Sequence, residues 1–447
     1  MTPGVGPGGA TPGAEQSTDS YLPEHGNGGY RVLHYDLDLD YRVGSNRLAG
    51  KAVITARAVQ SLSRFSLDLG RFRVRDVRVD GRPATFGHRQ GKLRIKPERP
   101  VPHGTAFKIE IRYAGTPVPV AGRWGDIGWD ELTDGVLVAS QPNGSPSWFP
   151  CNDRPDDKAT FLVALTAASP YTVLATGDLV SRRRGAGTTT WVYERNEPTA
   201  PYLMSVQVGR YELVDLAAGG VVQRAAIPPR LRPVFRHDFA RHGEIMVAME
   251  RLFGPYPFRE YVVVVADDDL DDPVEAQGMA VFGRNHLDGR RTHERLIAHE
   301  LAHQWFGNSL TVADWRHIWL NEGFATYAEW LWSAASGGPP AGAHAAEWYG
   351  RLTALPPDLT VADPGVDRMF DPLVYKRGAL TLHALRLKVG AEAFFALLRS
   401  WAAEHRHGTV TTAQFRAHCR RFTAEPLDDL FAAWLDRPAL PPLPRAW

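Results

Sequence analysis

Two histidines, His299 and His303, have the spacing in this sequence that most clearly suggests chemistry. They lie in a run over residues 296–305 that lacks Gly and Pro and is rich in Leu, Ile and Ala, which predicts a buried helix. Because side chains four residues apart lie one above the other on a helix, both imidazoles can face one metal ion. A catalytic zinc ion takes three protein ligands and keeps one position open for water.

Glu322 is the candidate third ligand, with eighteen residues between it and His303. A chain reversal near Gly307 and a second helix through residues 319–325 would bring its carboxylate back to the histidines. Glu300 leaves the first helix at a different angle, so it can reach a metal-bound water without being a ligand, as a general base must. The pattern predicts a hydrolase with one zinc ion. The alternative, two core histidines beside a surface acid, is disfavoured because the third ligand is present.

The composition is that of a globular protein with more than one domain. The 447 residues are 44% apolar and 23% charged, and this length exceeds one ordinary core. A formal net charge of +1 without a basic block argues against a nucleic-acid partner. Two distant cysteines, Cys151 and Cys419, indicate no disulfide framework, and no run of eighteen apolar residues predicts a membrane span. Residues 1–29 are rich in Gly, Pro, Ser and Thr and lack a signal-peptide core, which predicts a disordered tail and a cytoplasmic location.

Hydrophobic periodicity changes along the chain and predicts two domains after this tail. Over residues 30–211 apolar and polar residues alternate and helical periodicity is weak, as in an antiparallel β domain. The pattern over residues 212–447 predicts mostly helices, with a buried strand at 261–265 that leads into an acidic cluster at 267–272. Such a cluster is typical of a solvated loop, although near a cleft it would attract a cationic substrate. Gln141, in a Pro-rich loop of the β domain, either meets a substrate or satisfies the loop backbone.

The two histidines and the spaced glutamate resemble the motif of the aminopeptidase N family of gluzincin metallopeptidases. The likeness covers about residues 30–440 and includes three further segments, at 148–161, 253–258 and 375–378, the last with Arg377 in place of the family's Lys. The resemblance implies an α+β multidomain fold, an N-terminal antiparallel β saddle domain followed by a mostly helical thermolysin-like catalytic domain. It also implies a short form without the family's large C-terminal helical domain, and a more open site that accepts longer peptides.

The resemblance assigns a role to each matching residue. Three residues match the ligands of a single Zn²⁺, namely His299, His303 and Glu322. Glu300 matches the base that activates water, and Tyr375 matches the tyrosine that stabilises the oxyanion. Glu275 matches the glutamate that binds the free α-ammonium of the substrate, and Gln141 stands where relatives carry a second amine-binding Gln or Glu.

Around Glu275 the sequence departs from the family's Gly-x-Met-Glu-Asn pattern, because the flanking Gly, Met and Asn are absent. The predicted function is a monomeric, zinc-dependent aminopeptidase that removes N-terminal residues from peptides. A zinc endopeptidase, or another zinc hydrolase with altered recognition of the N-terminus, is the alternative. A non-catalytic peptidase-like scaffold is disfavoured, because such a scaffold would be expected to lose ligands and this chain keeps all three, with the base and the tyrosine.

Overall fold

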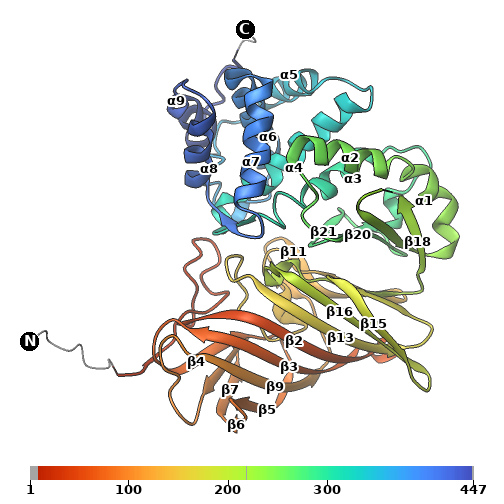
Figure 1. Cartoon of the computed structure of the whole chain (residues 1–447), viewed down its shortest axis with the longest axis vertical. Helices are drawn as coiled ribbons and strands as arrows, with labels where there is room; N and C mark the ends of the chain where they lie inside the picture. The colour runs from red at the N-terminus through yellow and green to blue at the C-terminus, as the bar shows by residue number, and fades with distance from the viewer. Residues whose placement is uncertain (1–8, 218, 445–447) are drawn as a thin grey trace, which may run out of the picture. The chain divides into compact units, whose positions relative to one another are not determined.

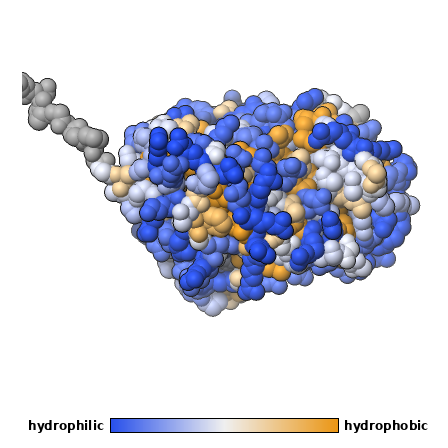
Figure 2. All heavy atoms as spheres, turned by 90° about the horizontal axis from the view of Figure 1, so that it is seen from below, coloured by the Kyte–Doolittle hydropathy of each residue, from blue (hydrophilic) through white to orange (hydrophobic). Residues whose placement is uncertain are grey.

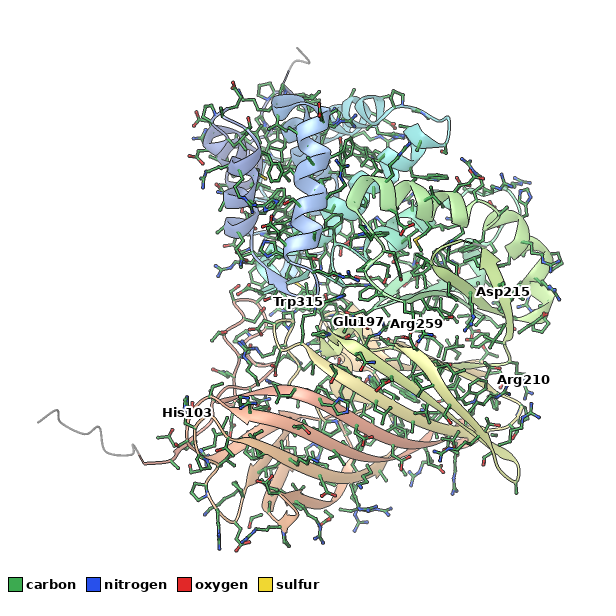
Figure 3. The ribbon with its side chains drawn as sticks, viewed as in Figure 1. His103, Glu197, Arg210, Asp215, Arg259 and Trp315 are labelled. Carbon is green, nitrogen blue, oxygen red and sulfur yellow. The ribbon has the colours of Figure 1, made fainter. Side chains whose placement is uncertain are left out.

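The computed structural model describes residues 9–217 and 219–444 of the chain. The chain divides into two compact units, Met1–Tyr211 and Glu212–Trp447, and the boundary falls between Arg210 and Asp215 (Figure 3). The N-terminal unit is built from β-strands and the C-terminal unit mostly from helices (Figure 1). The predicted order, a β domain followed by a mostly helical domain, is confirmed.

The largest sheet of the N-terminal unit has eight strands in the order β15-β16-β13-β2-β3-β9-β5-β6. Strand β2 (Tyr30–Arg42) pairs parallel with β13 and antiparallel with β3. Its buried residues alternate with more exposed ones, as the sequence pattern predicts for a strand with one covered face. The other strands of this sheet are β3 (Arg47–Ala58), β5 (Arg73–Val79), β6 (Arg82–Pro83), β9 (Ala106–Gly115), β13 (Ala159–Ala168), β15 (Asp178–Arg184) and β16 (Thr188–Thr199).

Two smaller sheets complete this unit, in the orders β1-β4-β8-β7 and β10-β11-β12-β17-β14. Buried side chains from all three sheets form one apolar core. On the face drawn in Figure 2, hydrophilic side chains separate the apolar ones into groups. The strands are β1 (Thr11–Pro12), β4 (Leu62–Asp68), β7 (Thr85–Arg89), β8 (Lys92–Lys96), β10 (Val120–Gly122), β11 (Gly125–Leu132), β12 (Gly135–Ala139), β14 (Thr172–Ala175) and β17 (Val206–Gly209).

The predicted disordered tail is wrong for residues 9–29, while residues 1–8 lie outside the described residues. Strand β1 pairs with β4, and the Gly26 N–H and the Asn27 side-chain amide donate to the buried Asp68 carboxylate at 2.9 and 3.0 Å. A Gly-rich backbone can approach a neighbouring surface closely, and a buried acceptor then holds it by hydrogen bonds. Composition does not reveal such contacts, because the acceptor lies about forty residues away in sequence.

A five-stranded sheet in the order β18-β19-β20-β22-β21 begins the C-terminal unit. Strand β20 runs parallel to both of its neighbours and is largely buried, as its β-branched sequence predicts. A separate pair, β23 and β24, is parallel. The strands are β18 (Glu212–Ala217), β19 (Val222–Ile227), β20 (Glu260–Ala266), β21 (Val274–Ala276), β22 (Met279–Gly283), β23 (Thr311–Val312) and β24 (Thr409–Val410).

Helices make up most of the remainder of the C-terminal unit. In the described part of the chain, the helices are too short or too polar to cross a membrane. The α-helices are α1 (Arg232–Asp238), α2 (His242–Phe253), α3 (Glu294–Ala302), α4 (Trp319–Ala335), α5 (Ala341–Leu352), α6 (Pro372–Val389), α7 (Ala391–Glu404), α8 (Thr412–Cys419) and α9 (Asp428–Phe431).

Candidate metal centre and active site

Helix α3 carries the first two candidate ligands. The helix begins and ends earlier than predicted: His303 is its C-cap residue, in helical conformation, and its N–H donates to the His299 carbonyl at 3.2 Å. The two rings therefore lie one turn apart, with their centroids separated by 4.8 Å. The chain then reverses at Gly307, whose φ of 122° is one that residues with side chains rarely adopt.

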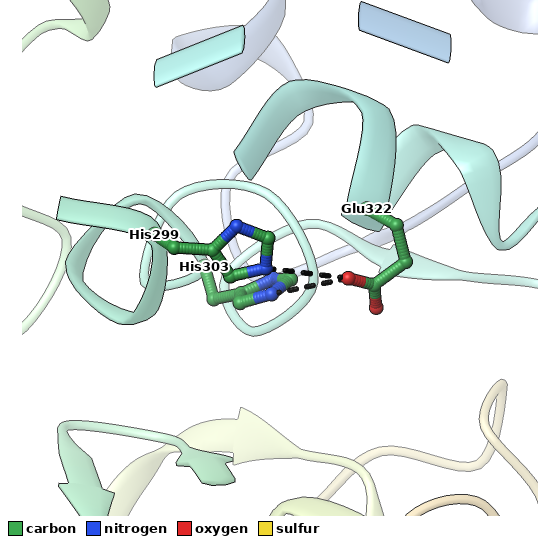
Figure 4. A group of neighbouring side chains, drawn as sticks. All are labelled: His299, His303 and Glu322. Carbon is green, nitrogen blue, oxygen red and sulfur yellow. Dashed lines mark ion pairs between the residues drawn. The ribbon is translucent and has the colours of Figure 1, made fainter. Parts of the chain in front are cut away.

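Glu322 lies in the first turn of α4 and faces both histidines (Figure 4). Its Oε2 atom is 3.5 Å from His299 Nε2 and 3.4 Å from His303 Nε2. All three side chains are buried, and their donor atoms lie within 4.8 Å of one another. The structure thus brings together the three residues that the sequence predicts as ligands.

The remaining ring nitrogens of both histidines are already engaged. His299 Nδ1 is 2.8 Å from Glu329 Oε1, and His303 Nδ1 is 3.0 Å from the Phe306 carbonyl oxygen. Because both partners are acceptors, each Nδ1 is the donor, and each Nε2 faces Glu322 and is the nitrogen that a metal ion would take after losing its proton. Two imidazole nitrogens and one carboxylate oxygen are the ligand types of a catalytic zinc with an open position. The residues present therefore fit a zinc ion.

The charges of the three groups attract one another strongly. Burial disfavours the charged form of each group, but the carboxylates outweigh it and raise the pKa of His299 to about 9 and that of His303 to about 10. In return, the histidines lower the pKa of Glu322 to about 2 against its burial. The centre is therefore a place where positive charge is favoured in the interior, as a metal site must be.

Glu300 lies on α3 beside these ligands without joining their donor set. Its side chain is buried, and burial raises the pKa of Glu300 to about 7, although the two histidines lower it. Its Oε2 atom has no hydrogen-bond partner among the described residues. A buried carboxylate that lies within 4.8 Å of a His303 ring nitrogen and has an oxygen without a partner among the described residues is suited to act as a base on a water molecule.

Two further predicted residues of the C-terminal unit lie at the same centre. Glu275 lies on the short strand β21, and its carboxylate is within 4.8 Å of donor atoms of Glu300 and His303. Tyr375 lies in the first turns of α6, and its ring is parallel to that of His299 with a centroid separation of 6.2 Å. Burial and the surrounding carboxylates raise the pKa of Tyr375 well above its usual range, so the phenol is a neutral donor. Gln141 belongs to the N-terminal unit, and its contact with substrate stays a prediction.

Glu329 is a residue of the centre that the sequence reasoning missed. Its carboxylate accepts from His299 Nδ1 and lies 3.2 Å from Arg295 Nη1 and 3.9 Å from Lys376 Nζ. A carboxylate behind a ligating histidine fixes the ring and its tautomer. The sequence could have indicated this residue, because Glu329 follows Glu322 by seven residues, which is two turns along one face of α4.

Two glycines set the distance between the helices that carry Glu322 and Tyr375. A Cβ added to Gly378 on α6 would lie 2.9 Å from the Cα of Gly323 on α4, and a Cβ added to Gly323 would lie 3.0 Å from the Cα of Gly378. The two backbones are therefore in direct contact at this point. Gly323 adjoins Glu322, and Gly378 is one turn beyond Tyr375, so this contact positions the tyrosine relative to the ligands.

Comparison with known proteins identifies the family. Residues 240–434 match the Peptidase family M1 domain, and residues 31–203 match the Peptidase M1 N-terminal domain. An M1 zinc metallopeptidase from Deinococcus radiodurans is 33% identical with a TM-score of 0.85, covering 96% of this chain and 98% of that chain. The chain belongs to peptidase family M1. The resemblance predicted from the motifs is confirmed, and the protein is a metallopeptidase of this family.

This M1 peptidase is also similar to longer curated proteins. It is 26% identical to leucine aminopeptidase 2 of Ajellomyces capsulatus, over 93% of this chain and 71% of that protein. It is 25% identical to aminopeptidase M1 of Arabidopsis thaliana, over 68% of this chain and 37% of that protein. The chain thus spans only about a third of the length of the second of these relatives.

Substituting Gly378 tests the contact between α4 and α6. In Gly378→Ala the added methyl group would push the helices apart, so we expect a loss of about 1–3 kcal/mol in the free energy of unfolding. Because small displacements at an active site are costly, turnover should fall by about tenfold to a hundredfold. Urea unfolding and steady-state kinetics measure the two effects. Gly350→Ala is the control, since that exposed glycine of α5 has nothing within 4 Å; equal behaviour of both variants would contradict the account.

Neutralising Glu329 tests whether it holds His299. In Glu329→Gln the amide keeps the shape but loses the charge, so we expect zinc affinity to fall by about tenfold to a hundredfold. Competition with a chromogenic chelator measures the affinity. Glu347→Gln, on the half-exposed face of α5, serves as the control and should bind zinc as the unmodified protein does. An unchanged zinc affinity in Glu329→Gln would show that Glu329 does not support metal binding.

Proposed function

We propose that the protein is a zinc-dependent aminopeptidase that releases residues one at a time from the N-terminus of peptides. The observation that carries this proposal is a second carboxylate, Glu275, within 4.8 Å of donor atoms of Glu300 and His303. Among relatives, two of the proteins compared above are named aminopeptidases, and a mutant of the Deinococcus peptidase is described with a Tyr-Ser-Ala substrate. Those names support the proposal.

A zinc ion held by His299, His303 and Glu322 would polarise the scissile carbonyl and make a water molecule more acidic. Glu300 is proposed to take a proton from that water and to pass it to the leaving amine. Burial raises the pKa of Glu300 above the usual range of a carboxyl group, which makes the carboxylate a better proton acceptor.

Tyr375 is proposed to stabilise negative charge that develops on the carbonyl oxygen. Its phenol stays protonated, because burial and the neighbouring carboxylates raise its pKa. A neutral donor held on a rigid helix needs no reorganisation as the charge forms, and its hydrogen bond strengthens in the transition state.

Glu275 is proposed to select the substrate end. A free α-ammonium group can pair with this carboxylate, whereas an internal peptide bond offers no positive charge. A peptide bound through its free N-terminus would then have its first peptide bond at the metal centre. The second candidate is an endopeptidase, which is favoured by the departure of the residues around Glu275 from the family's Gly-x-Met-Glu-Asn pattern.

Paired peptides that differ only in N-terminal acetylation test the proposal. We expect the zinc-loaded protein to cleave the free-amine peptides one residue at a time and to leave the acetylated ones intact. Glu300→Gln is the blank, and it should keep its zinc while turnover falls by about a thousandfold. Equal cleavage of both series would make the protein an endopeptidase, and substantial activity in the blank would reject Glu300 as the base.

Replacing the phenol tests the role of Tyr375. In Tyr375→Phe the ring that lies parallel to His299 remains, but the donor is lost, so we expect kcat to fall by about a hundredfold or more with little change in KM. Zinc content and thermal stability should stay at the level of the unmodified protein. A kcat within a factor of two of that level would show that Tyr375 does not act on the transition state.

A further inference from the structure

A side chain next to the metal-binding helix holds the turn that follows Glu275. Gln304 is fully buried, and its Oε1 accepts the Gly278 N–H at 2.7 Å. Its Nε2 lies within donating distance of the carbonyl oxygens of Ala276 and Met279, at 3.2 and 3.4 Å. A single carboxamide thus connects to both ends and to the middle of the turn that joins β21 to β22.

This turn determines where Glu275 lies. Glu275 pairs with Ala280 across β21 and β22, and the next pair, Ala276 with Met279, closes the hairpin. Gly278 within the turn has a φ of 80°, so its conformation is one that glycine favours. A displacement of the turn would move the Glu275 backbone with it, because the two share a three-residue strand.

Gln304 also has a fixed relation to the metal centre. It directly follows His303, and its Nε2 is 3.4 Å from the Glu300 carbonyl oxygen. A second carboxamide supports the same turn, since Asn308 Nδ2 donates to the Ala276 carbonyl at 2.9 Å. These hydrogen bonds fix the position of the hairpin that carries Glu275 relative to the helix that carries Glu300 and to the following residue, His303.

The contacts of Gln304 with this hairpin are all with the main chain. They therefore do not depend on which side chains flank Glu275, and in this sequence those flanking residues differ from the family pattern. A buried amide whose donors and acceptor all have partners is expensive to replace, because an apolar substitute leaves the partners unsatisfied.

We propose that Gln304 is the residue that positions Glu275 and thereby makes the enzyme require a free N-terminus. The inference rests on the proposed aminopeptidase function. Gln304 touches neither substrate nor metal in this role: it is a positioning residue that acts through the turn between β21 and β22.

Gln304→Met tests the inference, because methionine keeps the size and removes the hydrogen bonds. The measured quantity is the ratio of kcat/KM for a free-amine peptide to kcat/KM for its acetylated form. We expect this ratio to fall about tenfold or more, mainly through a higher KM for the free-amine peptide. A merely structural role would reduce active enzyme and lower both values equally, leaving the ratio unchanged. Zinc content is determined for each variant.

Gln207→Met is the matched control. Gln207 is equally buried in the N-terminal unit, where its Nε2 donates to Ser205 Oγ at 2.8 Å. The ratio should stay unchanged in this variant. Should Gln304→Met fail to fold, Asn308→Ala removes the second bond to Ala276 and should lower the ratio in the same direction; an unchanged ratio there overturns the inference.

Glu275→Gln, measured in parallel, separates failure of the inference from failure of the proposed function. A lower ratio in both Glu275→Gln and Gln304→Met supports both. A lower ratio in Glu275→Gln with an unchanged ratio in folded, zinc-loaded Gln304→Met overturns the role of Gln304 alone. The proposed recognition of the N-terminus, and the inference with it, is overturned by either of two results. One is an unmodified enzyme that shows no preference for the free amine, and the other is an unchanged ratio in Glu275→Gln.

Discussion

The attraction between the Glu322 carboxylate and the imidazoles of His299 and His303 is the interaction on which the rest of the centre depends. None of these groups is stable as an isolated charge in the interior, and each is nonetheless buried. Their mutual attraction, visible in the raised pKa values of the histidines and the lowered pKa of Glu322, offsets that cost. The arrangement in which these three groups attract one another also presents three ligand atoms to one cation. Protein stability and metal binding therefore depend on the same contacts.

Around this centre, rigid elements rather than long loops carry the functional side chains. Helices α3, α4 and α6 supply the candidate ligands, base and oxyanion donor, and a short hairpin supplies Glu275. A specific short-range contact holds each of three of these parts in place. The glycine contact fixes α6 against α4, Glu329 fixes the ring of His299, and Gln304 fixes the hairpin. Such supporting contacts keep reacting groups within the small tolerances that catalysis requires.

Local patterns in the sequence predicted what depends on local geometry. The spacing of His299 and His303 predicted two rings one turn apart, and the alternation of apolar and polar residues over 30–211 predicted a domain built from strands. The prediction for residues 9–29 was wrong, because a buried carboxylate from a distant strand orders a segment whose composition suggests disorder. Glu329 was missed although it lies two turns beyond Glu322 on one face of α4. The glycine contact and the role of Gln304 depend on which backbones meet in the fold, and no spacing in one chain encodes that.

Zinc K-edge X-ray absorption on the purified protein is the most direct test of the central claim, that His299, His303 and Glu322 hold one catalytic zinc ion. We expect one zinc per chain, with two nitrogen ligands at about 2.0–2.1 Å, a carboxylate oxygen at about 2.0–2.2 Å and no sulfur. The signal should disappear in Glu322→Ala prepared in the same way. A spectrum with sulfur scatterers at about 2.3 Å, or full zinc occupancy in that variant, would contradict the assignment of the centre.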